Sequence, residues 1–76
     1  MVKDFAYYMG LNYPIVLTRD EDSTGWYAEI PLIGALGDGA TPDEAVADVR
    51  DALQGWISIM LEDGDVIPEP ELTHVE

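Results

Sequence analysis

Carboxylates give this chain its greatest capacity for chemistry, because 16 of its 76 residues are Asp or Glu. Three pairs lie close together in the sequence: Asp20 with Asp22, Asp38 with Asp43, and Asp63 with Asp65. Paired carboxylates can bind a divalent cation or divide general-acid and general-base roles. Neither Asp-x-Asp pair continues to the Glu that closes a calcium-binding loop. Since so many acidic residues produce close pairs by chance, we interpret these carboxylates as solvated turn residues and predict no metal site.

The other reactive side chains lack the neighbours that catalysis requires. His74 is the only histidine and stands near the chain end, where segments usually fray. No nucleophile motif surrounds Ser23 or Ser58, and Gly37-Asp38-Gly39 lacks the later glycine and lysine of a phosphate-binding loop. We therefore predict no catalytic residue, no cofactor and no enzymatic activity. A metal-dependent nuclease built on clustered carboxylates stays as a weaker alternative.

Charge is the strongest compositional signal. The formal net charge is -13, because only Lys3, Arg19 and Arg50 oppose the acidic residues. Such a field repels nucleic acid and anionic membranes and attracts basic proteins. Solubility or adaptation to high salt explains the charge equally well, and both interpretations stay open.

Length and composition predict one small domain, residues 1–76, with a thin core. There is no cysteine to form a disulfide, so we expect a homo-oligomer, a dimer or a tetramer, to supply further stability. No apolar run is long enough to span a membrane, and the first ten residues do not resemble a signal peptide. We expect a cytoplasmic protein that contacts neither membrane nor nucleic acid directly.

Two apolar segments predict a β-hairpin. Residues 13–19 are rich in β-branched and aromatic side chains, and 26–30 alternate between apolar and polar positions. Residues 20–25 form an acidic turn between them. In the second strand, Trp26, Ala28 and Ile30 are expected to face the core. Tyr27 and Glu29 are expected on the opposite face, which is either solvated or used for contact.

A third strand is expected over residues 32–37. Gly34 lies inside it, which indicates a bulge or a close backbone approach. Gly37 and Gly39 flank Asp38 and predict a turn before the next element.

Residues 42–63 predict a long helix with well-defined ends. Thr41 is a suitable N-cap, Pro42 suits the first helical position, and Glu44 completes a capping box. Gly64 suits the C-terminal cap. An apolar stripe at helical spacing is expected to pack on the sheet: Ala45, Val46, Val49, Ala52, Leu53, Trp56, Ile57 and Met60.

The predicted architecture is α+β, a three-stranded antiparallel sheet with one long helix on one face. Residues 1–12 form an N-terminal arm with a short helix over 5–9 that Asp4 caps. Residues 13–38 form the sheet, 41–63 the main helix, and 65–76 an extended tail with a possible short strand at Val66-Ile67.

Residues 13–70 together resemble the HicB-like antitoxin family. The matching segments are 13–18, the turn ending at Gly25, Trp26-Tyr27-Ala28-Glu29-Ile30-Pro31, Gly34, residues 37–45, Leu53, Trp56, and Ile67-Pro68-Glu69-Pro70. The family often has Cys where this chain has Ala35. Longer members carry a C-terminal DNA-binding module, which this sequence lacks, so we expect no operator binding.

The resemblance implies a partial ribonuclease-H-like fold and a protein that binds and neutralises a small basic HicA-like toxin that cleaves messenger RNA. An acidic inhibitor suits such a basic target. The alternative is a free-standing oligomeric structural or regulatory domain without a toxin. From exposure and charge we expect the partner contacts at Asp20, Glu21, Asp22, Tyr27 and Glu29, with structural roles for Gly34, Thr41, Pro42, Glu44 and Trp56.

Overall fold

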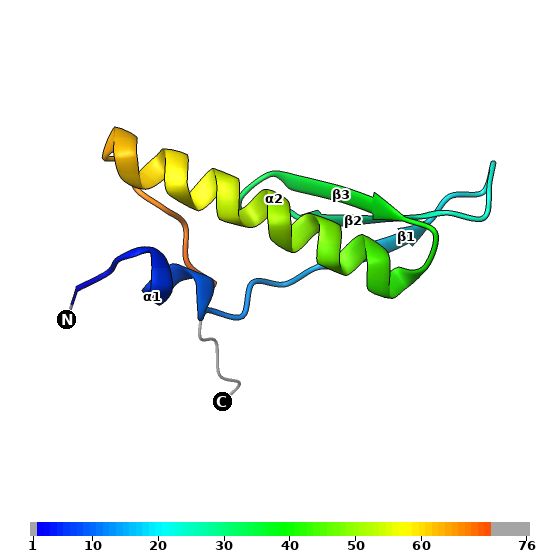
Figure 1. The fold of residues 1–76 in the computed structure, drawn as a ribbon, viewed down its shortest axis with the longest axis horizontal. Coiled ribbons are helices and arrows are strands. Elements are labelled where there is room, and N and C mark those ends of the chain that lie inside the picture. The colour runs from blue at the N-terminus through cyan, green and yellow to red at the C-terminus, as the bar shows by residue number, and fades with distance from the viewer. Residues whose placement is uncertain (1, 71–76) are drawn as a thin grey trace, which may run out of the picture.

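A computed structural model describes residues 2–70, which form a three-stranded antiparallel sheet with a long helix across one face (Figure 1). The elements follow in the order α1 (Phe5–Met9), β1 (Val16–Arg19), β2 (Trp26–Ile30), β3 (Ala35–Gly39) and α2 (Pro42–Asp63). The sheet order is β1-β2-β3, so each strand pairs with its neighbour in the chain. This confirms the predicted α+β architecture. The likeness to a ribonuclease-H-like fold stays a prediction.

In the hairpin of β1 and β2, successive side chains point to opposite faces of the sheet, as the alternation of apolar and polar residues predicts. Ala28 and Ile30 are buried beneath α2, whereas Tyr27 and Glu29 point away from the helix and are exposed. β1 begins only at Val16, three residues later than predicted. Pro14 cannot donate to a strand ladder, and the Tyr13 hydroxyl instead donates to the Pro68 carbonyl over 2.6 Å.

β3 also starts later than predicted, at Ala35 rather than at residue 32. Residues 31–34 form a tight turn in which the Ile30 carbonyl accepts from the Ile33 and Gly34 amides over 3.1 and 2.8 Å. Gly34 has φ +89°, and no atom lies within 4 Å of an added Cβ. The expected bulge or close approach at Gly34 is therefore wrong, because the turn requires glycine for its positive φ.

The close backbone approach lies further along the chain, at Gly37 and Gly39. The sequence predicts these residues in a turn, but both belong to β3. A Cβ at Gly37 would lie 2.4 Å from the Val49 amide nitrogen, and one at Gly39 would lie 2.5 Å from the Glu44 Cβ. The glycines thus bring the β3 backbone directly against the backbone of α2.

α2 spans residues 42–63 as predicted, and side chains satisfy its first amides. Thr41 Oγ1 accepts from the Glu44 amide over 3.1 Å, and Pro42 occupies the first turn. The Glu44 carboxylate accepts from the Ala40 amide over 2.9 Å, one residue earlier than in a standard capping box. Gly64, with φ +72°, ends the helix in the left-handed conformation.

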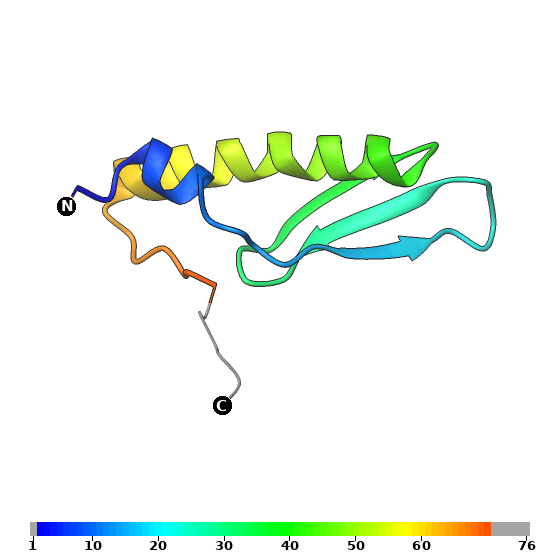
Figure 2. The ribbon, with the colours of Figure 1, turned by 90° about the horizontal axis from the view of Figure 1, so that it is seen from below.

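α2 is longer than the sheet it covers. Its 22 residues span about 33 Å, whereas a five-residue strand spans about 17 Å. The C-terminal half therefore extends past the strands to α1 (Figure 2). Trp56 lies in this half and is 42% exposed, so its predicted place in the core is wrong. The buried residues of α2 are Ala45, Val49, Leu53 and Ile57.

Residues 65–70 fold back as an extended segment against the N-terminal arm. Ile67 is buried there, but Val66 and Ile67 form no strand in the part of the chain that the structure describes. Glu69 accepts from the Tyr7 hydroxyl over 2.8 Å and forms a 3.0 Å ion pair with Lys3. The short helix α1 spans residues 5–9, as predicted, with Asp4 as its N-cap. These contacts tie the 65–70 segment to the N-terminal arm, and α1 packs against the half of α2 that extends past the sheet.

We predict that Gly37→Ala destabilises the protein by about 3 kcal/mol, because the new methyl group overlaps the α2 backbone. Gly55→Ala is the matched control: Gly55 lies in α2 with no atom within 4 Å of an added Cβ. It should stabilise by about 1 kcal/mol through helix propensity. Urea unfolding of both variants measures the difference, and equal stabilities would contradict the close approach.

Candidate functional site

The acidic hairpin turn between β1 and β2 is organised by one carboxylate, that of Asp20. Its Oδ1 accepts from the Asp22 amide over 3.0 Å. Its Oδ2 accepts from the hydroxyls of Ser23 and Tyr27 over 2.9 and 3.2 Å. The Asp20 amide in turn donates to the Gly25 carbonyl over 2.9 Å, which closes the hairpin. Asp20 therefore holds the turn in shape and orients the Tyr27 ring.

These hydrogen bonds shift the pKa values of Asp20 and Tyr27 in opposite directions. The Asp22 amide, followed by the Ser23 hydroxyl, holds the pKa of Asp20 below its ordinary value, because both donate to the charged form. The bond to Asp20 raises the pKa of Tyr27, since the phenol must keep its proton to donate. Near neutral pH the turn thus combines a charged carboxylate with a neutral phenol.

The sheet face opposite α2 carries two cross-strand rows of side chains. Val16, Glu29 and Leu36 form one row, and Thr18, Tyr27 and Asp38 form the other. They line a shallow groove of about 380 Å³, together with Asp48 from α2. Val16, Tyr27 and Leu36 are 49%, 50% and 68% exposed. We call this surface the outer groove.

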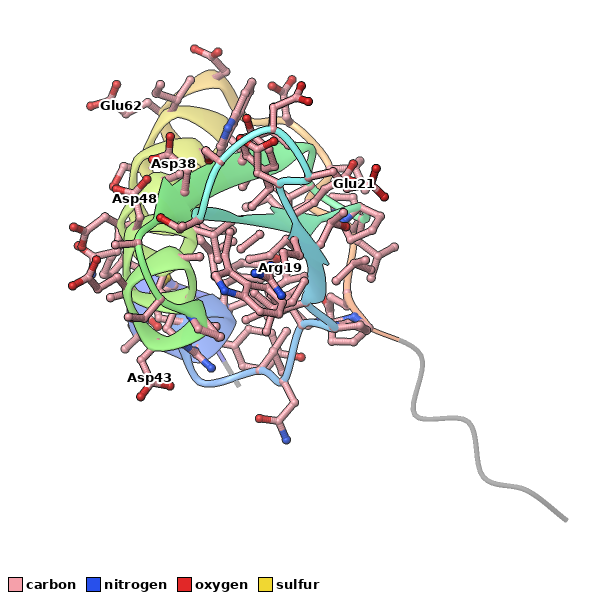
Figure 3. The ribbon with its side chains drawn as sticks, turned by 90° about the vertical axis from the view of Figure 1, so that its right-hand side faces the viewer. Arg19, Glu21, Asp38, Asp43, Asp48 and Glu62 are labelled. Carbon is pink, nitrogen blue, oxygen red and sulfur yellow. The ribbon has the colours of Figure 1, made fainter. Side chains whose placement is uncertain are left out.

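The outer groove combines an apolar floor with carboxylates from three elements. Glu29 lies on β2, Asp38 on β3 and Asp48 on α2. Asp48 accepts from the Asp38 amide over 2.9 Å, and Figure 3 shows the two side chains on the same flank of the molecule. Such a surface can bind a basic protein segment through its charge and through the alkyl stems of Lys or Arg.

The structure separates the residues predicted for partner contact into two groups. Asp20 and Tyr27 are joined by their hydrogen bond, and Glu29 lies two residues further along β2 on the same outer face. Glu21 and Asp22 are exposed at the tip of the turn, and Figure 3 shows Glu21 pointing outward.

Sequence reasoning did not place Asp38 or Asp48 at the outer groove. Asp38 was paired there with Asp43, but its structural neighbour is Asp48, ten residues away. The signal for that contact was the Gly37-Asp38-Gly39 sequence, which permits α2 to approach β3.

The carboxylates of the described residues do not assemble into a metal-ligating cluster. Within residues 2–70, no three His, Asp or Glu side chains lie close enough together to hold a metal ion. His74 falls outside the described residues. In the same part of the chain, no helix has the length and apolar character needed to cross a membrane.

Comparison with known families identifies the class of the chain. Residues 13–76 match the family model described as the HicB-like antitoxin of a bacterial toxin-antitoxin system. The chain belongs to the HicB-like antitoxin family. No curated protein and no solved structure matches the chain closely enough to add to this assignment.

We predict that Asp20→Asn lowers the thermal unfolding midpoint at pH 7, because an amide nitrogen cannot accept from the Ser23 and Tyr27 hydroxyls. The folded pKa of Asp20 is depressed, so its stabilisation is present above the ordinary value of 3.8 and is lost as the pH falls through the folded value. The gap between the unfolding midpoints of Asp20→Asn and the wild type should therefore narrow as the pH is lowered.

Glu21→Gln is the control for this prediction, because it removes one charge from the same turn. Glu21 is exposed and has no hydrogen-bond partner among the described residues. The thermal unfolding midpoint of Glu21→Gln should stay close to that of the wild type from pH 7 down to acidic pH. A matching loss in both variants would assign the effect to charge and contradict the role of Asp20.

Proposed function

We propose that this protein binds and neutralises a small basic HicA-like toxin that cleaves messenger RNA. Its membership of the HicB-like antitoxin family supports the toxin-antitoxin role. The observation that carries the proposal is the outer groove, where Glu29, Asp38 and Asp48 border an apolar floor. A toxin that binds RNA must present a basic surface, and this groove is complementary to one.

The contact surface in this proposal joins the outer groove to the hairpin turn. Glu21 and Asp22 at the tip of the turn extend the negative field beyond the sheet and steer the basic partner. Tyr27 lies between the two regions and supplies an aromatic face for Lys or Arg. The bound antitoxin covers the RNA-binding face of the toxin and so competes with phosphate groups.

In this proposal the protein acts by binding and not by catalysis. The net charge of -13 disfavours direct contact with nucleic acid, so the toxin is the partner that meets RNA. Both proteins act in the cytoplasm, where messenger RNA is found. We also infer that the antitoxin is a homo-oligomer.

The test combines this chain with the short basic protein encoded beside its gene. We expect the basic protein alone to cleave messenger RNA, and an equimolar amount of this chain to stop the cleavage and co-purify with it. A neighbour that neither binds this chain nor cleaves RNA would contradict the proposal and favour the free-standing structural or regulatory domain.

The double variant Glu21→Lys/Asp22→Lys should lower the association rate with that toxin by about tenfold and weaken its salt dependence. The double variant Asp51→Lys/Glu62→Lys changes the net charge equally, but at exposed positions of α2. Stopped-flow measurements at several salt concentrations compare the two. If both variants slow association equally, the turn is not part of the contact surface.

A further inference from the structure

α2 carries a second apolar face beside its buried one. Trp56 and Ile59 are 42% and 53% exposed, although both are large apolar side chains. They are three residues apart in a helix and are therefore neighbours on its surface. Neighbouring exposed apolar side chains, tryptophan above all, are typical of protein contact surfaces. This face therefore lacks a partner among residues 2–70.

The spacing of residues on this face fits a second helix. Four residues at positions i, i+3, i+4 and i+7 form the hole that receives one side chain of a facing helix. On this face of α2 they are Ala52, Gly55, Trp56 and Ile59. The first two are small and leave space between the two large side chains. We call these four residues the α2 hole.

Nothing within residues 2–70 requires Gly55 to be glycine. An added Cβ meets no atom within 4 Å, and the φ of Gly55 is not positive. Neither a close approach, as at Gly37, nor a left-handed backbone, as at Gly34, therefore explains it. Glycine inside a helix lowers stability relative to alanine. A partner helix that packs closely on α2 supplies a reason, because a side chain at Gly55 would fill the hole.

Carboxylates surround the α2 hole. Asp48 lies four residues before it and Asp63 four residues after it, on the same side of the helix. Asp51 and Glu62 lie on the adjoining outer side, and Figure 3 shows Asp48 and Glu62 on one flank of the molecule. Arg50, the only basic residue of α2, lies on the opposite side of the helix. A second copy of this chain brings the same carboxylates and is repelled, whereas a helix bearing Lys or Arg is attracted.

We propose that the α2 hole binds an amphipathic helix of the basic toxin, which places an apolar side chain in the hole and Lys or Arg beside the surrounding carboxylates. This inference rests on the proposed function, because it assigns a second contact to the same partner. Asp48 borders both the α2 hole and the outer groove. One toxin molecule can thus cover both surfaces across the edge of β3, where Asp48 binds the Asp38 amide.

Gly55→Gln tests the hole without unfolding the chain. Glutamine is a better helix former than glycine, so urea unfolding should show a variant at least as stable as the wild type. The new side chain fills the hole, so the affinity for the basic protein encoded beside this gene should fall about tenfold or more. Ala47→Gln is the matched control, because it adds the same group at an exposed position on the side of α2 opposite Trp56. Calorimetric titration should show unchanged affinity for this control.

Trp56 reports directly on the occupation of the hole. The chain is labelled with fluorotryptophan, and the variant Trp26→Phe assigns the remaining fluorine NMR resonance to Trp56. Addition of the unlabelled basic protein should shift the Trp56 resonance in the wild type. The shift should be lost in Gly55→Gln, because the filled hole excludes the partner helix. A merely structural role of Trp56 predicts no shift in either protein.

Two results would overturn this inference and leave the proposed function intact. One is equal toxin affinity of Gly55→Gln and the wild type, and the other is a Trp56 resonance that toxin binding leaves in place. A basic protein that does not bind the wild type contradicts the proposed function, and this inference with it. If Gly55→Gln changes the sedimentation of this chain alone and keeps its toxin affinity, the hole joins two copies and the toxin helix is the wrong occupant.

Discussion

The structure depends on one close contact, the approach of the β3 backbone to the backbone of α2. Side chains normally separate a helix from the sheet it covers, but Gly37 and Gly39 remove them at two alternate positions of the strand. The first half of α2 consequently lies low over β2 and β3, where Ala45 and Val49 are fully buried. In a chain with so thin a core, this packing leaves little room for change on the inner face.

The same contact decides what remains uncovered. Within residues 2–70, α2 is drawn toward β3, so it covers β1 least of the three strands, and no element packs on the opposite sheet face (Figure 2). It also delivers Asp48 to the edge of β3, where its carboxylate binds the Asp38 amide and adds charge to the outer groove. The packing of the core and the composition of the outer groove are thus consequences of one geometry.

The surface of this HicB-like antitoxin is divided by charge. Carboxylates border the outer groove and the hairpin turn, whereas the stretch 5–19 carries none. Under the proposed function, this division would steer a basic partner toward the groove and the turn, where the carboxylates are concentrated. Asp20 contributes to it mainly by holding the turn in shape.

The sequence by itself determined the type and order of the elements. The alternation in residues 26–30, the apolar period of residues 42–63 and the caps at Thr41 and Gly64 all act through neighbours within one turn or one strand. Local signals of this kind need no knowledge of the rest of the chain. The resemblance to the antitoxin family likewise rested on the order of residues.

Only the tertiary structure decided where β3 begins, why Gly37 and Gly39 are glycines, and that Trp56 is partly exposed. Each of these depends on a distance between segments that are far apart in the sequence. Trp56 carries the same helical phase as Val49, but in this half of α2 Ile57, the next residue, takes the buried position in a cluster with Tyr8 and Ile67. The phase of an apolar stripe is a property of one helix, whereas the side that is buried depends on which elements pack against it, here the sheet along one half and α1 along the other.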